Sequence, residues 1–193
     1  MSEGLGERSL AEFARLLAAD RPVPGSGCGL AAIGALGAAL ASMALRAGRG
    51  EVPPAAARLE ELSARLLAAV DEDARAYSAY RAACAGEGEL APALAASIDV
   101  PRAVVAAALE GLRLLRAGVA GVRPRLRSEA YGASRALLTT VEGASFTARA
   151  NLPGLADGAE RARHERELAE QVAEAARLAQ DLDLLLHAPL PSG

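Results

Sequence analysis

The sequence predicts an all-α protein, and three observations support this fold class. Hydrophobic residues make up 52% of the chain, but aromatic residues only 3%, so the core must be built from Ala, Leu and Val. Ala and Leu are strong helix formers, whereas the long β-branched runs typical of strands are absent. Apolar residues also recur at steps of three and four. We therefore expect a multihelical antiparallel bundle of about six helices.

The first two helices are predicted on either side of a stiff turn. Ser9 and Glu12 form a capping box, so the first helix should run over residues 10–20. Residues 21–27 contain two prolines and two glycines and should form a sharp turn. The next helix, residues 27–47, has a side of small residues, and its other side is apolar, so we expect burial on most sides. The small residues are Gly27, Ala31, Gly34, Ala38 and Ala41, and the apolar ones are Leu30, Ile33, Leu36, Leu40 and Met43.

Four further helical segments follow. Pro53 and Pro54 should open a long helix over residues 54–85, because proline in the first turn loses no helical hydrogen bond. Pro101 predicts a break between a short segment, residues 91–97, and a separate helix over residues 102–117. After a basic connection, Ser128 is the expected N-cap of a helix that ends near Asn151. The last helix should run from Asp157 to His187.

Length, charge and cysteine content limit the organisation and partners. We expect one domain over residues 1–193, because this length supports one sizeable core. A formal charge of −3 gives no general attraction for nucleic acid or anionic lipid, so neither is expected as a partner. Residues 1–13 lack the pattern of a signal peptide, and Cys28 and Cys84 allow at most one disulfide. These features indicate a cytoplasmic protein.

The turn of residues 24–28 is the first candidate site. It brings several backbone amides to a helix N-terminus, where the helix dipole favours an anion or a carbonyl oxygen. An ordinary tight connection between two helices explains the same pattern equally well. Cys28 at this position has the environment of a thiol with a lowered pKa, although no His is near in sequence to activate it.

Two further features point to polar surfaces inside the bundle. Asp73 lies on an apolar stripe, so its carboxylate needs a partner, and a structural ion pair with an Arg competes with a catalytic role. One face of the helix after Ser128 is small and polar, and it should line a cavity or a partner unless it faces water. Its residues are Glu129, Gly132, Ala136, Thr140, Gly143, Thr147 and Asn151. His164 and His187 have no clustered ligands, so no metal site is expected.

These landmarks, in this order, resemble the cyclodeaminase/cyclohydrolase family, which includes the cyclodeaminase domain of formiminotransferase-cyclodeaminase and methenyltetrahydrofolate cyclohydrolase. The family's Pro-Gly-Gly-Gly-Ser turn is similar to residues 24–28, and its Asp-Ala-x-Ala-aromatic segment is similar to residues 73–77. Val100-Pro101 matches a recurring pair, and Ser128-Glu129 and residues 147–152 match its later motifs. Departures from these motifs occur at Ser26, Cys28, Glu129 and Thr147.

The resemblance implies a homodimer that acts on a one-carbon tetrahydrofolate without a metal or cofactor. The implied reaction is hydrolysis of methenyltetrahydrofolate to formyltetrahydrofolate, or release of ammonia from formiminotetrahydrofolate. Asp73 and Glu129 would be the catalytic carboxylates facing the reactive carbon. The implied substrate-binding residues are Pro24, Gly25, Ser26, Gly27, Cys28, Thr147, Asn151 and Arg127.

Alternatives to this assignment remain at the level of sequence. The basic connection contains three arginines: Arg123, Arg125 and Arg127. They could bind the anionic glutamate tail of folate, or they could equally be solvated loop residues. The four departures are compatible with a folate-binding protein that no longer catalyses a reaction. A purely structural helical dimer would account for the small-residue faces as interface.

Overall fold

The computed structural model describes residues 4–48 and 51–188, and no strand occurs within those ranges. A short helix, α1, is followed by five long ones, which confirms the all-α prediction. The helices are α1 (Leu10–Leu17), α2 (Ser26–Arg46), α3 (Pro54–Cys84), α4 (Leu90–Gly118), α5 (Arg127–Asn151) and α6 (Gly158–His187). Four short 3-10 turns are η1 (Leu5–Glu7), η2 (Val119–Gly121), η3 (Pro124–Leu126) and η4 (Leu152–Gly154).

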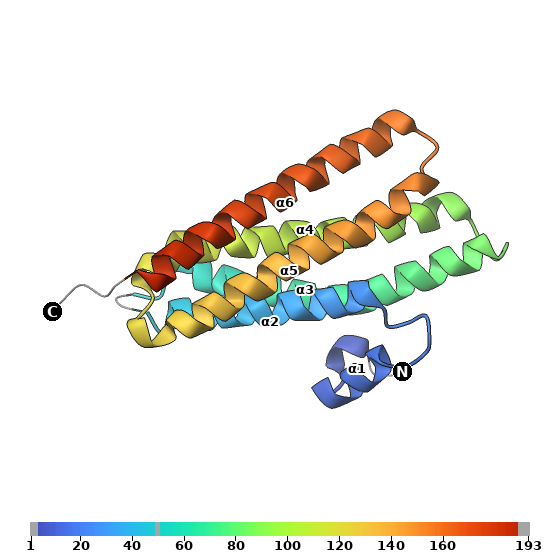
Figure 1. Ribbon diagram of the computed structural model, residues 1–193. Helices are drawn as coiled ribbons and strands as arrows, with labels where there is room; N and C mark the ends of the chain where they lie inside the picture. Colours follow the sequence, from blue (N-terminus) through green and yellow to red (C-terminus); the bar gives the residue numbers. More distant parts are fainter. Residues whose placement is uncertain (1–3, 49–50, 189–193) are drawn as a thin grey trace.

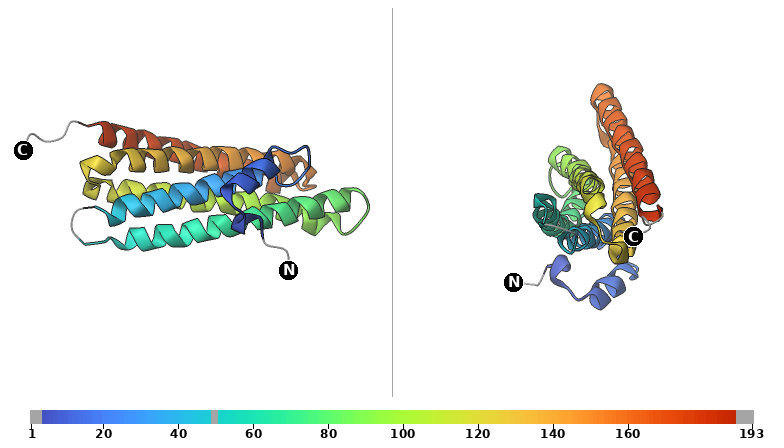
Figure 2. Two further views of the ribbon diagram at one scale, coloured as in Figure 1. Left: turned by 90° about the horizontal axis from the view of Figure 1, so that it is seen from below. Right: turned by 90° about the vertical axis from the view of Figure 1, so that its left-hand side faces the viewer.

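The five long helices form the antiparallel bundle that was predicted, and α1 lies across one side of it (Figure 1). Helix α2 packs against α3 and α5, and α4 packs against the same two helices. Helix α6 covers α5 and α4, so it lies on the opposite side from α1 (Figure 2). This arrangement brings the start of α2, the end of α5 and the start of α4 to the same end of the bundle.

Local capping explains where several helices begin. The Glu12 amide donates to Ser9 Oγ at 3.3 Å, which confirms the predicted capping box. Asp157 caps α6 by accepting from the Ala159 amide at 2.8 Å. The prediction of Ser128 as an N-cap is wrong, because α5 begins one residue earlier and the Ser128 hydroxyl donates to the adjacent Glu129 carboxylate instead.

Residues 90–118 form one continuous helix, so the predicted break at Pro101 between a short segment, residues 91–97, and a helix over residues 102–117 is wrong. Pro101 lies inside α4 and is buried among the neighbouring helices. Proline removes only one donor from the ladder, and packing against α3, α5 and α6 on several sides holds the remaining helix together. Tertiary contacts therefore override the local break.

The small side of α2 is buried as predicted, and it forms a close seam with α5. A Cβ atom added to Gly37 would lie 2.9 Å from Ala136 Cβ, and one added to Gly34 would lie 2.9 Å from Thr140 Cγ2. Thr140 Oγ1 donates to the Leu30 carbonyl at 3.1 Å across this seam. The middle of the small and polar face of α5 is therefore a helix-packing surface.

The opposite side of α2 is exposed in the single chain, so the prediction that α2 is buried on most sides is wrong for one copy. Leu36 is 57% exposed, and three more apolar residues on this side are also exposed: Ile33, Leu40 and Met43.

By length and composition alone, α2 and the segment 90–121 would be long enough to cross a membrane. Their packing inside the bundle accounts for the same apolar composition.

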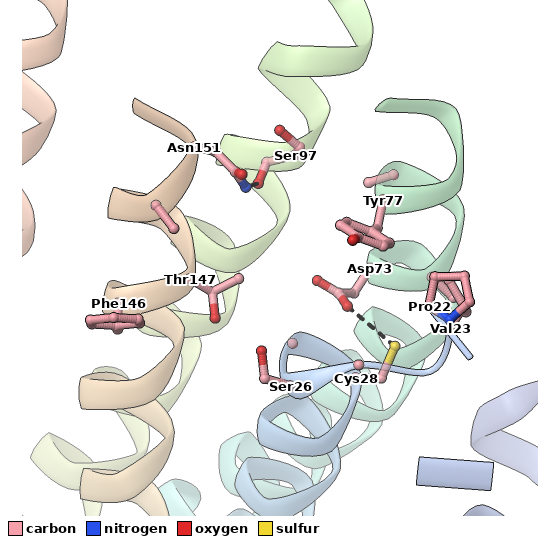
Figure 3. Close-up of a pocket in the computed structure, with 15 residues that line it drawn as sticks. Pro22, Val23, Ser26, Cys28, Asp73, Tyr77, Ser97, Phe146, Thr147 and Asn151 are labelled. Atoms are coloured by element: carbon pink, nitrogen blue, oxygen red, sulfur yellow. Dashed lines mark hydrogen bonds between the residues drawn. The ribbon is translucent and has the colours of Figure 1, made fainter. Parts of the chain in front are cut away.

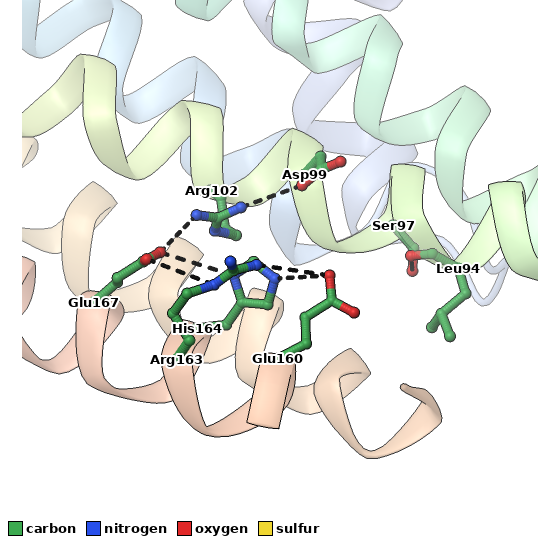
Figure 4. Close-up of polar contacts among 8 residues, drawn as sticks. All are labelled: Leu94, Ser97, Asp99, Arg102, Glu160, Arg163, His164 and Glu167. Atoms are coloured by element: carbon green, nitrogen blue, oxygen red, sulfur yellow. Dashed lines mark hydrogen bonds and ion pairs between the residues drawn. The ribbon is translucent and has the colours of Figure 1, made fainter. Parts of the chain in front are cut away.

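An ion-pair network joins α4 to α6 near the middle of the bundle (Figure 4). Arg102 on α4 donates to Glu167 at 2.8 Å and to Asp99 at 3.3 Å. His164 is only 6% exposed and lies between Glu160 and Glu167, with nitrogen–oxygen distances of 3.7 and 3.8 Å. These contacts attach α6 to the rest of the fold.

Candidate functional site

A cavity of about 290 Å³ lies where α2 begins, between α3, α4 and α5 (Figure 3). The turn before α2 forms one wall, and the last two turns of α5 form the facing wall. Its lining residues are Pro22, Val23, Gly25, Ser26, Gly27, Cys28, Asp73, Ala74, Ala76, Tyr77, Ser97, Phe146, Thr147, Ala150 and Asn151. The cavity thus combines the predicted turn, Asp73 and the end of the polar face of α5.

Asp73 is the one carboxylate among the described residues that line this cavity. It projects from α3 toward the start of α2 (Figure 3), and it accepts a hydrogen bond from Cys28 Sγ at 3.2 Å. The predicted Arg partner is wrong, because no ion pair involving Asp73 occurs in the part of the chain that the structure describes. Burial therefore dominates and raises the pKa of Asp73, while the Cys28 thiol and amide lower it in part.

Cys28 is a hydrogen-bond donor and not a reactive thiolate. It is 1% exposed, and burial together with the Asp73 charge raises its pKa to about 12. The predicted lowering of this pKa by the helix N-terminus is therefore wrong, because desolvation and a like charge outweigh the helix dipole. At neutral pH the thiol stays protonated and donates to Asp73.

Gly27 allows the Asp73 carboxylate to reach the start of α2. A Cβ atom on Gly27 would overlap sterically with the Asp73 carboxylate, so any side chain there would displace the carboxylate. No side chain caps α2 at its N-cap residue, Gly25. The amides of Ser26 and Gly27 precede the first internal hydrogen bonds of the helix, and they remain available to a ligand.

The end of α5 contributes two polar side chains to the cavity. Thr147 Oγ1 donates to the Gly143 carbonyl at 3.2 Å, so its oxygen keeps acceptor capacity toward the cavity. Asn151 Nδ2 donates to the Ser97 carbonyl at 2.9 Å. Both residues belong to the predicted substrate-binding set, and the structure brings them to the same cavity as Asp73.

Sequence reasoning missed several residues of the cavity wall. Tyr77 is 41% exposed and lies one turn after Asp73, so helical spacing alone could have identified it. Phe146 is 78% exposed beside Thr147, at the rim. Ser97 could have been identified from the proline four residues later, which leaves its carbonyl without a helical donor.

Glu129 does not share this cavity within one chain. It lies in the first turn of α5, about 27 Å along the helix axis from Thr147 at roughly 1.5 Å per residue. Its carboxylate is at the other end of the bundle and accepts from the Ser128 hydroxyl at 2.7 Å. The expectation that Asp73 and Glu129 converge on one carbon is therefore wrong for a single copy.

Pro24 and Arg127 also lie outside the cavity. Pro24 is buried beneath the turn, and its neighbours Pro22 and Val23 form the wall instead. Arg127 is at the Glu129 end of the bundle, where it donates to the Ala188 carbonyl at 2.6 Å. The length of α5 explains why Glu129 and Arg127 are distant from the cavity, because the start and end of α5 lie at opposite ends of the molecule.

In residues 4–48 and 51–188, no three His, Cys, Asp or Glu side chains are grouped so that they could hold a metal ion. The cavity instead offers one carboxylate, helix-terminal amides, a hydroxyl and an amide. Such a set can transfer a proton and stabilise a cationic centre.

Comparison with known proteins identifies the family. The family model for formiminotransferase-cyclodeaminase matches residues 9–170. The chain belongs to this family. Among solved structures, formiminotetrahydrofolate cyclodeaminase from Thermotoga maritima superposes with a TM-score of 0.83 and 26% sequence identity, covering 93% of this chain and 96% of that one. A comparison with curated proteins gives no match.

Membership of the formiminotransferase-cyclodeaminase family confirms the resemblance on which the site prediction was based. The family match includes every residue of the cavity, from Pro22 to Asn151. At Cys28, one of the departures, the thiol donates to Asp73, a contact that a hydroxyl group could also make.

Proposed function

We propose that this protein acts on a tetrahydrofolate carrying a one-carbon unit, and that it releases ammonia from formiminotetrahydrofolate. The observation that carries the proposal is the position of Asp73, a carboxylate without a cationic partner among the described residues, at the start of α2 in the cavity. The substrate class is supported by the family and by the activity named for the Thermotoga maritima protein.

The proposed reaction closes a ring on the formimino carbon. In the substrate this carbon is bonded to N5 and doubly bonded to an imino nitrogen. N10 attacks it, a C–N10 bond forms, and N10 gives up its proton. The former imino nitrogen receives the proton that N10 gave up and a second proton from solution, and it leaves as ammonia. The product is the methenyl cation, in which N5 and N10 share the positive charge.

Asp73 fits the role of the group that moves these protons. Burial raises the pKa of Asp73, which favours proton transfer by this group, so its carboxylate can accept the N10 proton and return it to the leaving nitrogen. The same negative charge stabilises the cation that develops on the amidine carbon. The Cys28 thiol donates to one carboxylate oxygen, which orients the group.

The start of α2 fits the role of a substrate anchor. Its unused amides and helix dipole would bind a pterin or carbonyl oxygen of the substrate. Tyr77 and Phe146 supply apolar surface beside the cavity for a planar ring. Asn151 and Thr147 offer polar contacts on the facing wall.

We also propose that the protein is a homodimer, as the resemblance implies, and that it is cytoplasmic, as its cysteine content and N-terminal sequence indicate. The exposed apolar side of α2 supports a dimer interface. Its exposed residues form a continuous stripe at helical spacing: Ile33, Leu36, Leu40 and Met43. A second copy would cover this stripe by symmetric contact of α2 with α2.

Replacement of Asp73 tests the proposed reaction. Asp73→Asn keeps the shape of the side chain but cannot exchange protons, so kcat for ammonia release should fall at least ~100-fold. The measurement is the appearance of ammonia and of methenyltetrahydrofolate absorbance from formiminotetrahydrofolate. Glu72→Gln is the matched control, because Glu72 is the exposed neighbour on α3 and does not line the cavity.

The same assays separate the competing functions. Loss of methenyltetrahydrofolate absorbance above a protein-free control, without ammonia release from the formimino substrate, would indicate a cyclohydrolase instead. A thermal shift with reduced folates but no turnover would indicate a binding protein. Full activity of Asp73→Asn would exclude Asp73 as the acid-base group.

A further inference from the structure

Pro101 interrupts the hydrogen-bond ladder of α4 next to the cavity. In a continuous α-helix the amide of residue 101 would donate to the carbonyl of residue 97. Proline has no amide hydrogen, and its ring pushes against the carbonyl four residues earlier. The Ser97 carbonyl is therefore left without a helical donor, and because Ser97 is only 5% exposed this carbonyl needs another partner.

Helix α5 supplies the missing donor. Asn151 Nδ2 donates to the Ser97 carbonyl oxygen at 2.9 Å, and the two residues lie side by side on the cavity wall in Figure 3. Because a carbonyl oxygen can only accept, this contact determines which way round the Asn151 amide lies. Asn151 Oδ1 is then the remaining polar atom of the amide, and no hydrogen bond to it occurs among the described residues.

We propose that Pro101 is a positioning residue: its missing amide reserves the Ser97 carbonyl for Asn151, and this orients Asn151 Oδ1 to accept from an N–H group of the ligand. The orientation of the Asn151 amide depends only on contacts within the protein. The identity of the ligand rests on the proposed function, in which the reduced pterin ring supplies the N–H donors. A ring that presented an acceptor here would leave two acceptors facing each other.

The effect of Pro101 on Asn151 can be removed by a single substitution. Pro101→Ala restores a helical amide that donates to the Ser97 carbonyl and competes with Asn151 Nδ2. Helix α4 should become no less stable, since alanine is a better helix former in a helix interior. The matched control is Pro92→Ala, because Pro92 lies in the first turn of α4, where a missing amide costs no helical bond.

Side-chain amide NMR of the ligand-free, ¹⁵N-labelled protein tests the orientation independently of activity. The Asn151 NH₂ pair is assigned by its loss in Asn151→Ala. In the unmodified protein, one proton of the pair should be shifted downfield and exchange slowly with water. Pro101→Ala should move this resonance upfield and speed its exchange, and Pro92→Ala should not. An unchanged pair in Pro101→Ala overturns the proposal.

A double-mutant cycle tests the consequence for the ligand. Pro101→Ala should raise KM for formiminotetrahydrofolate about fivefold, the amount typical of one neutral hydrogen bond, and lower kcat less. In the Asn151→Ala background the same substitution should change KM by less than about twofold. An equal rise in both backgrounds would mean that Pro101 acts through helix shape only. If the unmodified protein has no turnover, the proposed function fails while the NMR result still decides the positioning role.

Discussion

Asp73 owes its chemical character to three neighbouring features at the start of α2. Gly27 leaves the space that the carboxylate occupies, Cys28 donates to one of its oxygens, and burial disfavours its charge. The absence of a described cationic partner separates this residue from the other inter-helix acids of the bundle, such as Glu110 and Glu174, which bind Arg58 and Arg113. Glu110 and Glu174 are neutralised by these arginines, whereas Asp73 has only the Cys28 donor in the described part of the chain.

The pH dependence of catalysis should report the Cys28 hydrogen bond. This bond lowers the pKa of Asp73, so Cys28→Ala should raise that pKa further. A carboxylate that acts as a base loses activity as the pH falls through its pKa, and the acidic limb of kcat/KM should therefore move to higher pH in Cys28→Ala. Cys28→Ser retains a donor and should restore the limb. Coincident profiles for all three proteins would contradict a role for the thiol.

At the residue level, the sequence predicted the turn, Asp73, Thr147 and Asn151 as members of one site. They lie together because the antiparallel bundle brings the start of α2, the later part of α3 and the end of α5 to one end of the molecule. The role of Glu129 was implied by the family resemblance, but Glu129 and Asn151 lie at opposite ends of a helix of 25 residues and so do not share a site within one chain. The charge state of Cys28 depended on burial, which its position at a helix start did not reveal.

The seam between α2 and α5 is the element that sets the shape of the bundle. Gly34 and Gly37 of α2 face Thr140 and Ala136 of α5, so the two helices approach closely at these positions. Helical spacing predicted the small side of α2 correctly. The sequence did not predict that the matching face of α5 would be used for packing in its middle and for the cavity only at its end.

Alanine substitutions of glycines should have opposite effects on stability inside and outside the seam between α2 and α5. Gly37→Ala places a methyl group 2.9 Å from Ala136 Cβ and should destabilise the protein by about 1–3 kcal/mol through overpacking. Gly132→Ala meets no atom within 4 Å and should stabilise α5 by roughly 0.5–1 kcal/mol. Thermal or urea unfolding gives both values. Equal effects at the two positions would rule out a close seam.

In the whole molecule, no element among the described residues covers the apolar outer side of α2. The fold itself was predictable, because composition, proline positions and helical spacing agree with one another along most of the chain. The break at Pro101 was the main error, since packing on several sides maintained α4 there. Exposure of the outer side of α2 could not be predicted from the sequence, because an apolar helix side looks the same whether the chain itself or a second copy covers it.

Sedimentation velocity should detect the proposed dimer. The unmodified protein should sediment as two 19.6 kDa chains, and Leu36→Glu should sediment as one, because a carboxylate at the centre of the stripe would be buried without a partner. Leu184→Glu is the control, since Leu184 is 69% exposed on α6, away from the stripe. A monomeric unmodified protein, or a dimeric Leu36→Glu variant, would refute this interface.

The contact of α2 with α5 also fixes the width of the space where a ligand must fit. Residues 26–28 lie on α2 before Gly34 and Gly37, and Thr147 lies on α5 after Ala136 and Thr140, which face those two glycines. An added methyl group between those helices would therefore spread the opposite walls of the cavity without touching anything bound there. Affinity for the proposed substrate should therefore also depend on Gly34 and Gly37, about two to three turns from the cavity, because their missing side chains leave room for the two helices to approach.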